Sequence, residues 1–497
     1  MILNLISLLG MFGLCAIAWL FSENRRLKFF PWRVVFTGIL LQLVLGALVF
    51  GFPVTQWALQ VFSSLLDGVF LAADTGANFV FGKNLVPLPT KPADINLGYI
   101  FAFRALPTVV FFSGLMALLQ NLGVIQAITG VFAKAFYHTM RLSGAEALSG
   151  AANIFVGIEA AIVVKPYLAK MTRSELCAIL SCCFGTAASS TLAIYVSFLR
   201  PVFPNILGHL VSASIIAIPA CFVLSKILVP ETEIPLTMGG VPQEEKTQRV
   251  QETVGGEPIE RMNSLDAAIV GALDGVKMAV AIAAVLILIL GFVSLINQIF
   301  AGLAGIPGGV GDFFKVVTLA NIEGALFLPF TILTGVSLEW SELWESSVLI
   351  GRRLFETAIP SYQALGLAAA RPDNPLSDRA VLIVSYALSG FAHLASVGIF
   401  VGGTIALIPS RRKDIADLGW KALFVGTLAT LMIACVAGVY DTGAASILGT
   451  KPNPQVTASP AAPTSLTSPA PRLTPSPKAA TSAPKVKASP AKPDAAR

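Results

Sequence analysis

The chain has 497 residues, of which 55% are hydrophobic and only 12% are charged. Soluble globular domains carry about 25% charged residues, so this composition excludes that class and predicts a protein that crosses a membrane several times. The net charge of +6 arises in the segment Lys451–Arg497, which holds seven Lys or Arg and one Asp, so the neutral remainder predicts no nucleic-acid partner.

Eight apolar runs are long enough to cross a bilayer as helices, which takes about 20 residues. We therefore predict an all-α polytopic membrane protein with about eight transmembrane helices. In chain order the runs are Ile2–Phe21, Val34–Phe52, Tyr99–Leu119, Leu176–Phe198, Leu207–Val229, Ala267–Ile296, Ala380–Ile408 and Trp420–Tyr440.

The segments between these runs are too short or too polar to cross the bilayer simply. Val54–Phe81 and Leu122–Thr139 favour interfacial helices, because they are amphipathic. Ser143–Leu168 and Trp344–Leu367 are predicted to be two re-entrant hairpins, each entering and leaving by one face of the membrane. Ala320–Val336 is expected to enter part-way, with a helix kink at its proline.

Two short basic loops predict the orientation of the chain. Positive residues favour the cytoplasmic side, so both loops are placed in the cytoplasm and both chain termini outside it. We expect a multi-pass protein of the cell inner membrane. The basic residues are Arg25, Arg26, Lys28 and Arg33 after the first predicted helix, and Arg411, Arg412 and Lys413 before the last.

The predicted organisation has seven segments. The last is rich in Pro, Ala, Ser and Lys, so it cannot bury a core and is expected to be disordered. The segments are N-terminal transmembrane helices 1–52, interfacial helices and scaffold helix 53–141, first hairpin, broken helix and following helix 142–230, hydrophilic loop 231–263, long scaffold helix and partial entry 264–343, second hairpin, broken helix and last helix 344–440, and tail 441–497.

The stretch Ser143–Tyr195 combines apolar sequence with polar and ionisable side chains such as Glu146, Asn153 and Glu159. A carboxylate at membrane depth costs several kcal/mol unless it faces a cavity or a partner. The small residues around these side chains allow helices to break without leaving backbone groups unsatisfied in lipid. This pattern predicts a substrate-and-ion site built from interrupted helices.

An internal repeat favours the same interpretation. The octamer Cys183–Ser190 can be laid over Gly390–Val397, and each follows a predicted hairpin with an acid near its middle, Glu159 or Glu356. Paired broken elements in two halves are typical of carriers that work by alternating access. Chance similarity between small-residue segments is the alternative explanation.

Three blocks of the sequence resemble the concentrative nucleoside transporter family. They are Gly98–Gln126 continuing into Ser143–Gly157, then Met171–Leu180, and finally Tyr386–Gly438. The resemblance extends over most of residues 70–440. It implies a homotrimer in which each protomer has a rigid scaffold and an inverted-repeat transport domain with two opposed hairpins. It also implies a nucleoside substrate and sodium or a proton as coupling ion, with no other cofactor.

The same resemblance implies two sets of site residues. Hard cations need oxygen ligands, which Asn153 and Thr186 side chains and unwound backbone supply. Asn153 as a plain helix-packing residue is the alternative. The implied sodium positions are Asn153, Val156, Thr186 and Ala187, and the implied substrate positions are Glu159, Ile158, Thr191, Glu356, His393 and Ser396.

The sequence departs from the family at the substrate positions. The family's Gln-Thr-Glu becomes Ile158 and Glu159, one residue shorter, and its ribose-binding Asn becomes His393. If Tyr362 is held in register, the family's ribose-binding Glu becomes Ala358, and Glu356 replaces it only if the hairpin shifts. Each ribose hydroxyl left unpaired costs about 1–3 kcal/mol. Either Glu356 substitutes, or the substrate is not an ordinary nucleoside.

Other charged groups are given structural interpretations. Glu146 and Lys165 are expected to pair or to anchor the ends of the first hairpin. His209 is expected near the membrane interface, and Arg353 with its neighbour Arg352 is expected to extend toward the lipid headgroups. Contact of the two arginines with an anionic group is the alternative.

Three functions remain open at this point. The preferred one is a cation-coupled secondary transporter that imports nucleosides or a related polar metabolite. A membrane receptor that binds ligand on the same fold without efficient transport is the alternative. A membrane-embedded enzyme using Glu159, Glu356 and His393 comes last, since imidazole can shuttle protons but could equally be a packed side chain here.

Overall fold

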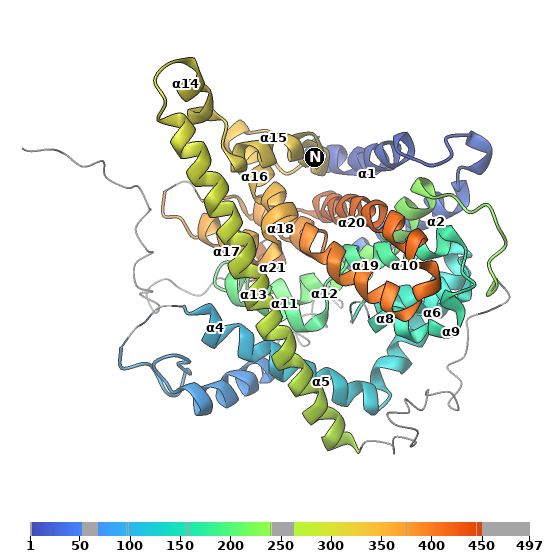
Figure 1. Cartoon of the computed structure of the whole chain (residues 1–497), viewed down its shortest axis with the longest axis horizontal. Coiled ribbons are helices and arrows are strands. Elements are labelled where there is room, and N and C mark those ends of the chain that lie inside the picture. The colour runs from blue at the N-terminus through green and yellow to red at the C-terminus, as the bar shows by residue number, and fades with distance from the viewer. Residues whose placement is uncertain are drawn as a thin grey trace, which may run out of the picture. The chain divides into compact units, whose positions relative to one another are not determined.

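The computed structural model describes residues 2–51, 68–95, 97, 99–155, 157, 159–238, 240, 263–373, 375–443 and 445–449. Within these ranges the chain is helical, with one isolated β-bridge between Leu88 and Lys91 and no strand. The prediction of an all-α fold is therefore confirmed (Figure 1). Most of the tail and most of the hydrophilic loop lie outside the described residues. The prediction of disorder was wrong for the start of the tail, where Ala445–Leu448 form a helix and the Asn205 N–H donates to the Leu448 carbonyl oxygen at 3.0 Å.

The first part of the chain supplies two long helices and the first structural repeat. A helical segment, Gly68–Phe81, lies where an interfacial helix was predicted. The elements are α1 (Ile2–Leu20), η1 (Leu27–Phe29), α2 (Trp32–Gly51), α4 (Phe101–Arg104), α5 (Leu106–Asn121), α6 (Val124–Met140), α7 (Gly144–Ala152), α8 (Glu159–Val163), α9 (Lys165–Leu168), α10 (Arg173–Gly185), α11 (Ser189–Leu199) and α12 (Ile206–Leu228).

The second part repeats the order of the first. A helix that packs on a hairpin precedes the hairpin in both halves, α6 against α7 and α15 against α16, and an interrupted helix follows it. The elements are α13 (Ser264–Ala304), α14 (Gly309–Val316), α15 (Leu319–Thr334), α16 (Trp340–Glu356), α17 (Ala358–Ala369), α18 (Asp378–Leu388), α19 (Leu394–Leu407), η2 (Pro409–Arg411), α20 (Arg412–Tyr440) and α21 (Ala445–Leu448).

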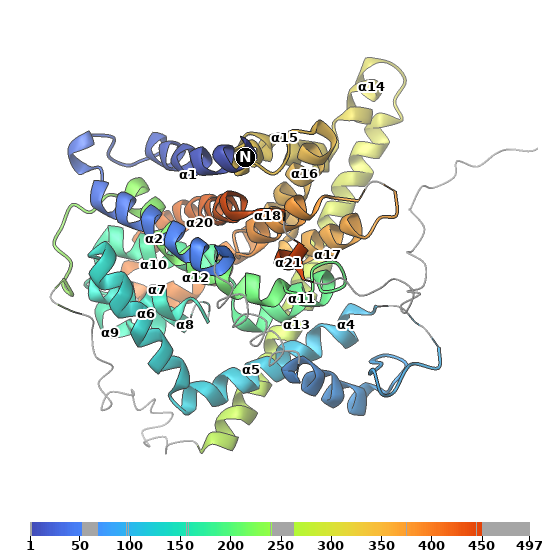
Figure 2. The same cartoon turned by 180° about the vertical axis from the view of Figure 1, so that it is seen from behind.

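Six helical stretches among the described residues are long and apolar enough to span a membrane. The interrupted helices α10–α11 and α18–α19 occupy two more of the predicted spans. The stretches differ greatly in burial: 89% of the most apolar 18-residue stretch of α12 is buried, against 6% of the corresponding stretch of α13. Figures 1 and 2 show α13 running obliquely across the outside of the other helices.

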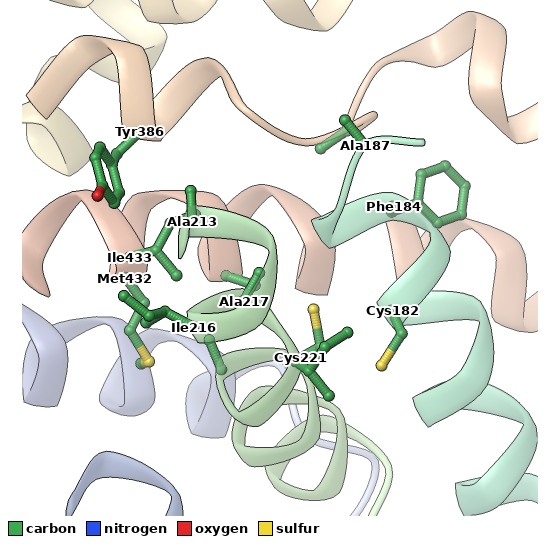
Figure 3. Close-up of a cluster of buried hydrophobic side chains, with 14 of the residues drawn as sticks. Cys182, Phe184, Ala187, Ala213, Ile216, Ala217, Cys221, Tyr386, Met432 and Ile433 are labelled. Carbon is green, nitrogen blue, oxygen red and sulfur yellow. The ribbon is translucent and has the colours of Figure 1, made fainter. Parts of the chain in front are cut away.

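The core lies between the first broken helix, α12 and α20, which pack against one another. Figure 3 shows Cys182 of α10 beside Cys221 of α12, and Ile433 of α20 beside Ala213 of α12. Small residues allow this close approach: a Cβ on Gly185 would meet the sulfur of Cys221. All six cysteines are free and buried, as small packing residues.

Local sequence signals explain where the first helix of the first hairpin and the first helices of both broken segments begin. Ser143 and Thr172 each accept a hydrogen bond from a backbone N–H three residues later and form a capping box with a Glu. Ser377 caps α18 through its side chain. These caps satisfy N–H groups that a helix start otherwise leaves without partners.

Two expectations about single residues were wrong. His209 is buried and contacts the Tyr386 hydroxyl and the Ile447 carbonyl, each at 3.0 Å, so it lies inside the fold and not at the interface. The Arg353 side chain is fully buried, so it does not extend toward the headgroups. α15 contains Pro329 within its length, and a 58° change of direction falls between α14 and α15.

Candidate functional site

The two helix breaks meet inside the protein. The backbone N–H of Phe391, in the break between α18 and α19, donates to the carbonyl oxygen of Thr186, in the break between α10 and α11, at 3.2 Å. A Cβ on Gly390 would lie 2.8 Å from the carbonyl oxygen of Gly185. The segments that the internal repeat paired by sequence are thus in direct contact through backbone.

The first hairpin ends near the same place. A Cβ on Gly150, in the last turns of α7, would lie 2.5 Å from Phe222 of α12. Gly185 at the first break packs on Cys221, which neighbours Phe222 in the chain. The end of α7 and the first break therefore lie against one stretch of α12, which brings Asn153 and Thr186 into the same region.

Asn153 has an unused oxygen in this region. It is fully buried at the end of α7, and its Nδ2 donates to the Ser149 carbonyl at 3.1 Å. Its Oδ1 has no hydrogen-bond partner. Buried polar atoms are normally paired, so an orphaned amide oxygen suits a cation ligand.

Thr186 and Ala187, both buried, supply further oxygens at the break. The Thr186 hydroxyl donates to the Cys182 carbonyl at 2.8 Å and keeps its own lone pairs. The part of the chain that the structure describes contains no group of three or more His, Cys, Asp or Glu that could hold a metal ion. A cation at the break would therefore be bound by neutral oxygens, which fits sodium; Val156 lies outside the described residues.

The second hairpin has a different tip. α16 ends at Glu356 and α17 begins at Ala358, with Thr357 between them at φ 74°, a left-handed conformation that is strained for a β-branched residue. Glu356 is 4% exposed and accepts hydrogen bonds from Arg352 at 2.7 and 3.0 Å. The acid predicted to substitute for the family's glutamate is thus held by its own helix.

Arg353 carries a positive charge to the second break. Its Nη1 donates to the Ala387 carbonyl in the last turn of α18 and to the Thr430 hydroxyl of α20. A guanidinium at a helix C-terminus satisfies a free carbonyl and complements the helix dipole. Its Nε and Nη2 have no partner. The sequence-based expectation that Arg353 extends toward the lipid headgroups missed these contacts, because no local sequence feature marks partners so distant in the chain.

His393 and Ser396 bond to each other. His393 is the N-cap of α19, and its ring contacts the Ser396 hydroxyl at 3.1 Å and the Ser396 N–H at 3.3 Å. Thr191 donates to the Ala188 carbonyl at 2.8 Å. All three side chains are buried beside the breaks. Glu159 begins α8, and Ile158 lies outside the described residues.

Buried charges of the first hairpin lie at its base. Glu146 forms an ion pair with Lys226 of α12 at 2.5 Å, with side-chain exposures of 1% and 6%. Lys226 also pairs with Glu231 at 3.1 Å. Lys165, which was expected to pair with Glu146 or to anchor the hairpin, is exposed.

Comparison with known proteins identifies relatives along almost the whole chain. The family described as "Na+ dependent nucleoside transporter C-terminus" matches residues 209–438, its N-terminus counterpart matches 9–84, and "Nucleoside recognition" matches 102–202. An uncharacterized transporter of Haemophilus influenzae is 36% identical over 89% of this chain and 99% of its own length. Nucleoside permease NupC of Helicobacter pylori is 31% identical over 88% and 98%.

Solved structures agree. CNTnw in an inward-facing substrate-bound state aligns with a TM-score of 0.74 at 36% identity, over 88% of this chain and 98% of that one. A CNTnw variant in an outward-facing state aligns with a TM-score of 0.75 at 37% identity. The fold described here is therefore similar to structures in both facing states.

Proposed function

The chain belongs to the concentrative nucleoside transporter family, and on that premise we propose that it is a sodium-coupled secondary transporter that imports nucleosides or a related polar metabolite. The observation that carries this proposal is the contact between the two helix breaks beside an unpaired Asn153 oxygen. Relatives are named transporters, which gives the receptor alternative no support and agrees with a non-enzymatic role.

We assign sodium to the first break. Asn153, Thr186 and Ala187 supply uncharged oxygens, and Val156 completes the set that the family resemblance implies. An ion held by neutral groups leaves no fixed negative charge behind when it departs. Return of the empty carrier then leaves no uncompensated charge at the ion positions themselves.

The substrate binds beside this ion in the proposal. Its contacts are Glu159 and Ile158 from the first hairpin, Thr191 after the break, and His393 and Ser396 at the start of α19. Glu356 reaches the substrate directly only if its ion pair with Arg352 opens. If Tyr362 keeps its place relative to the family, Ala358 stands where the family has its ribose-binding Glu. The second tip then suits a solute that needs no carboxylate there, such as a nucleoside with a modified sugar.

Alternating access follows from the two-hairpin construction. Both tips carry polar groups that are costly in an apolar barrier. Ion and solute together cover those groups, so the loaded carrier crosses and a half-loaded one does not. The scaffold would be the exposed α13 with α5, against which it packs, and in a homotrimer α13 would face other protomers or lipid. Both termini are proposed to lie outside the cytoplasm, in the inner membrane.

The test is uptake by the purified chain in proteoliposomes, across nucleosides, nucleobases and sugar-modified nucleosides, with and without a sodium gradient. We expect sodium-driven uptake of at least one of them. Asn153→Ala should raise the sodium concentration needed for half-maximal uptake, while Asn84→Ala, in an exposed loop, serves as the control.

Glu159→Gln and Ser396→Ala should each lower uptake about tenfold, because one buried hydrogen bond to the substrate is worth about 1–3 kcal/mol. Unchanged uptake in both variants would move the substrate away from the breaks. Uptake that does not depend on the sodium gradient and is unchanged in Asn153→Ala would contradict the assignment of sodium to the first break.

A further inference from the structure

Glu323 is a buried acid that the proposed transport site does not use. It lies on α15, is 1% exposed, and neither carboxyl oxygen has a hydrogen-bond partner. Gly351 of the second hairpin packs on it so closely that a Cβ there would lie 2.5 Å from the Glu323 carbonyl oxygen. The acid therefore faces the first helix of that hairpin.

On the facing helix α16, the charged residues that follow Gly351 are Arg352, Arg353 and Glu356. Arg352 and Glu356 form an ion pair with each other at 2.7 Å. Arg353 on the same helix is turned toward α18 and α20 instead.

The other helices that pack on α15 are α1, α13 and α20, and they supply no counter-charge. α1 has no charged residue. The charged residues of α13 are Asp266, Asp274 and Lys277, all in its N-terminal part, and Lys277 pairs with Asp274. The charges of α20 end at Lys421, which is bound to Glu23 and Asp417. Asp312 and Lys315 of α14 pair with each other.

The count of charges is therefore unbalanced. Two buried carboxyl groups share one guanidinium, which leaves one negative charge in apolar surroundings if both are ionised. Such a charge costs several kcal/mol, and two carboxyls competing for one partner relieve that cost by retaining a proton. This argument holds whichever of the two acids is bound to Arg352.

We propose that Glu323 holds one exchangeable proton and competes with Glu356 for Arg352, in a site between α15 and the second hairpin that is distinct from the sodium positions. The pair has two arrangements. With Glu323 protonated, Arg352 binds Glu356, as observed. When the proton leaves, Glu323 competes for Arg352, and Glu356, which directly precedes the strained Thr357 of the tip, loses its partner. Proton binding thereby biases the conformation of the tip.

Proton binding can be measured without transport. Infrared spectroscopy of the purified full chain in liposomes, titrated with pH, should show a protonated-carboxyl band that disappears at high pH. Glu323→Gln should remove this band, and Glu356→Gln should also remove it, because Arg352 then pairs with Glu323. Glu345→Gln is the control, since Glu345 on the same helix is bound to Arg371 near the surface. A band that survives both variants would overturn the inference.

Transport provides the second readout and rests on the proposed function. Uptake by the unmodified chain should depend on pH, and Glu323→Gln should flatten the profile while sodium dependence remains. If no solute is taken up but the band behaves as stated, the proposed function fails and the proton site stands. If sodium-driven uptake occurs with an identical pH profile and band in Glu323→Gln, the proton site fails and the transport proposal stands.

Discussion

The two hairpins have the same construction but place their ion pairs at opposite ends. In the first, the buried ion pair Glu146–Lys226 lies at the base, next to the capping boxes, and the end of α7 offers the uncharged Asn153 oxygen, with Glu159 at the start of α8. In the second, Arg352 and Glu356 lie at the tip, with Glu323 against the same helix. An unpaired uncharged oxygen suits a metal cation, whereas carboxyl groups that compete for one guanidinium suit a proton.

The starts of the two broken helices show a related asymmetry. Arg173, the first residue of α10, binds Glu23 in the loop after α1, and Arg379 in α18 contacts Asn4 and Ser7 of α1. The Arg173 pair is about one-third exposed, at 33% and 31%, while Arg379 and Asp441 are 13% and 10% exposed. The same kind of contact should therefore be worth more in the second half. Four changes test these contrasts.

The largest effect is expected at the base of the first hairpin. Lys226→Met leaves Glu146 buried without its partner, and breaking a buried pair from one side costs about 3–5 kcal/mol. The melting temperature of the detergent-solubilised chain should fall sharply. The double variant with Glu146→Leu should recover much of the loss, because it removes the uncompensated charge as well. A single variant as stable as the parent would show that this base carries no buried charge.

Arg379→Gln comes next. Arg379 donates to the Gly335 carbonyl at 2.9 Å and to Asp441 at 2.9 Å, and hydrogen bonds that involve a charged group contribute about 1.5–3 kcal/mol. Arg173→Gln, its counterpart, should cost at most about 1 kcal/mol, because its partners are partly exposed. Thermal unfolding of both variants gives the ranking. Equal losses would mean that burial does not separate the two anchors.

The contact between the breaks is tested by Gly390→Ala. The new methyl would lie 2.6 Å from the Thr430 methyl group and 2.8 Å from the Gly185 carbonyl oxygen. Overpacking of this kind costs about 1–3 kcal/mol, and here it also separates the two breaks, so uptake should fall more than stability. Gly398→Ala on α19 is the matched control, since its Cβ would meet open space. Equal uptake by both variants would show that the close contact is unnecessary for transport.

Hydrophobic length and periodicity were sufficient to predict much of this fold. The spans, both hairpins and the two interrupted helices follow from runs of apolar residues and from small-residue clusters, which are local features. The capping boxes at Ser143 and Thr172 are also local, and their spacing alone would have fixed where α7 and α10 begin.

The partners of buried polar groups could not be predicted in this way. His209 bonds Tyr386, and Arg353 bonds Thr430, across separations in sequence that no period encodes. Position near the end of an apolar run suggested a membrane-interface role for His209, and the length of the Arg353 side chain suggested that it reaches the headgroups. Neither argument takes into account that neighbouring helices can enclose such a side chain. The candidate site shares this limit, because its breaks were visible in sequence but their contact was not.

The smallest effect concerns pH and the exposed anchor. Partial burial raises the pKa of Glu23, but hydrogen bonds and charges from Arg173 and Lys421 outweigh it, so the pKa lies below its ordinary value of 4.5. A carboxyl with a lowered pKa in the folded protein stabilises it at pH values above the unfolded pKa, and this contribution is lost as the pH falls through the folded pKa. At neutral pH the Glu23→Gln variant should therefore melt at a slightly lower temperature than the parent, and its free energy of unfolding should be lower by at most about 1 kcal/mol. The difference should shrink as the pH falls below 4.5 and vanish once the pH is below the lowered pKa of Glu23 in the folded protein. Since Glu23 ties the loop after α1 to α10 and α20, a difference that persists in acid would show that this anchor acts through shape and not charge.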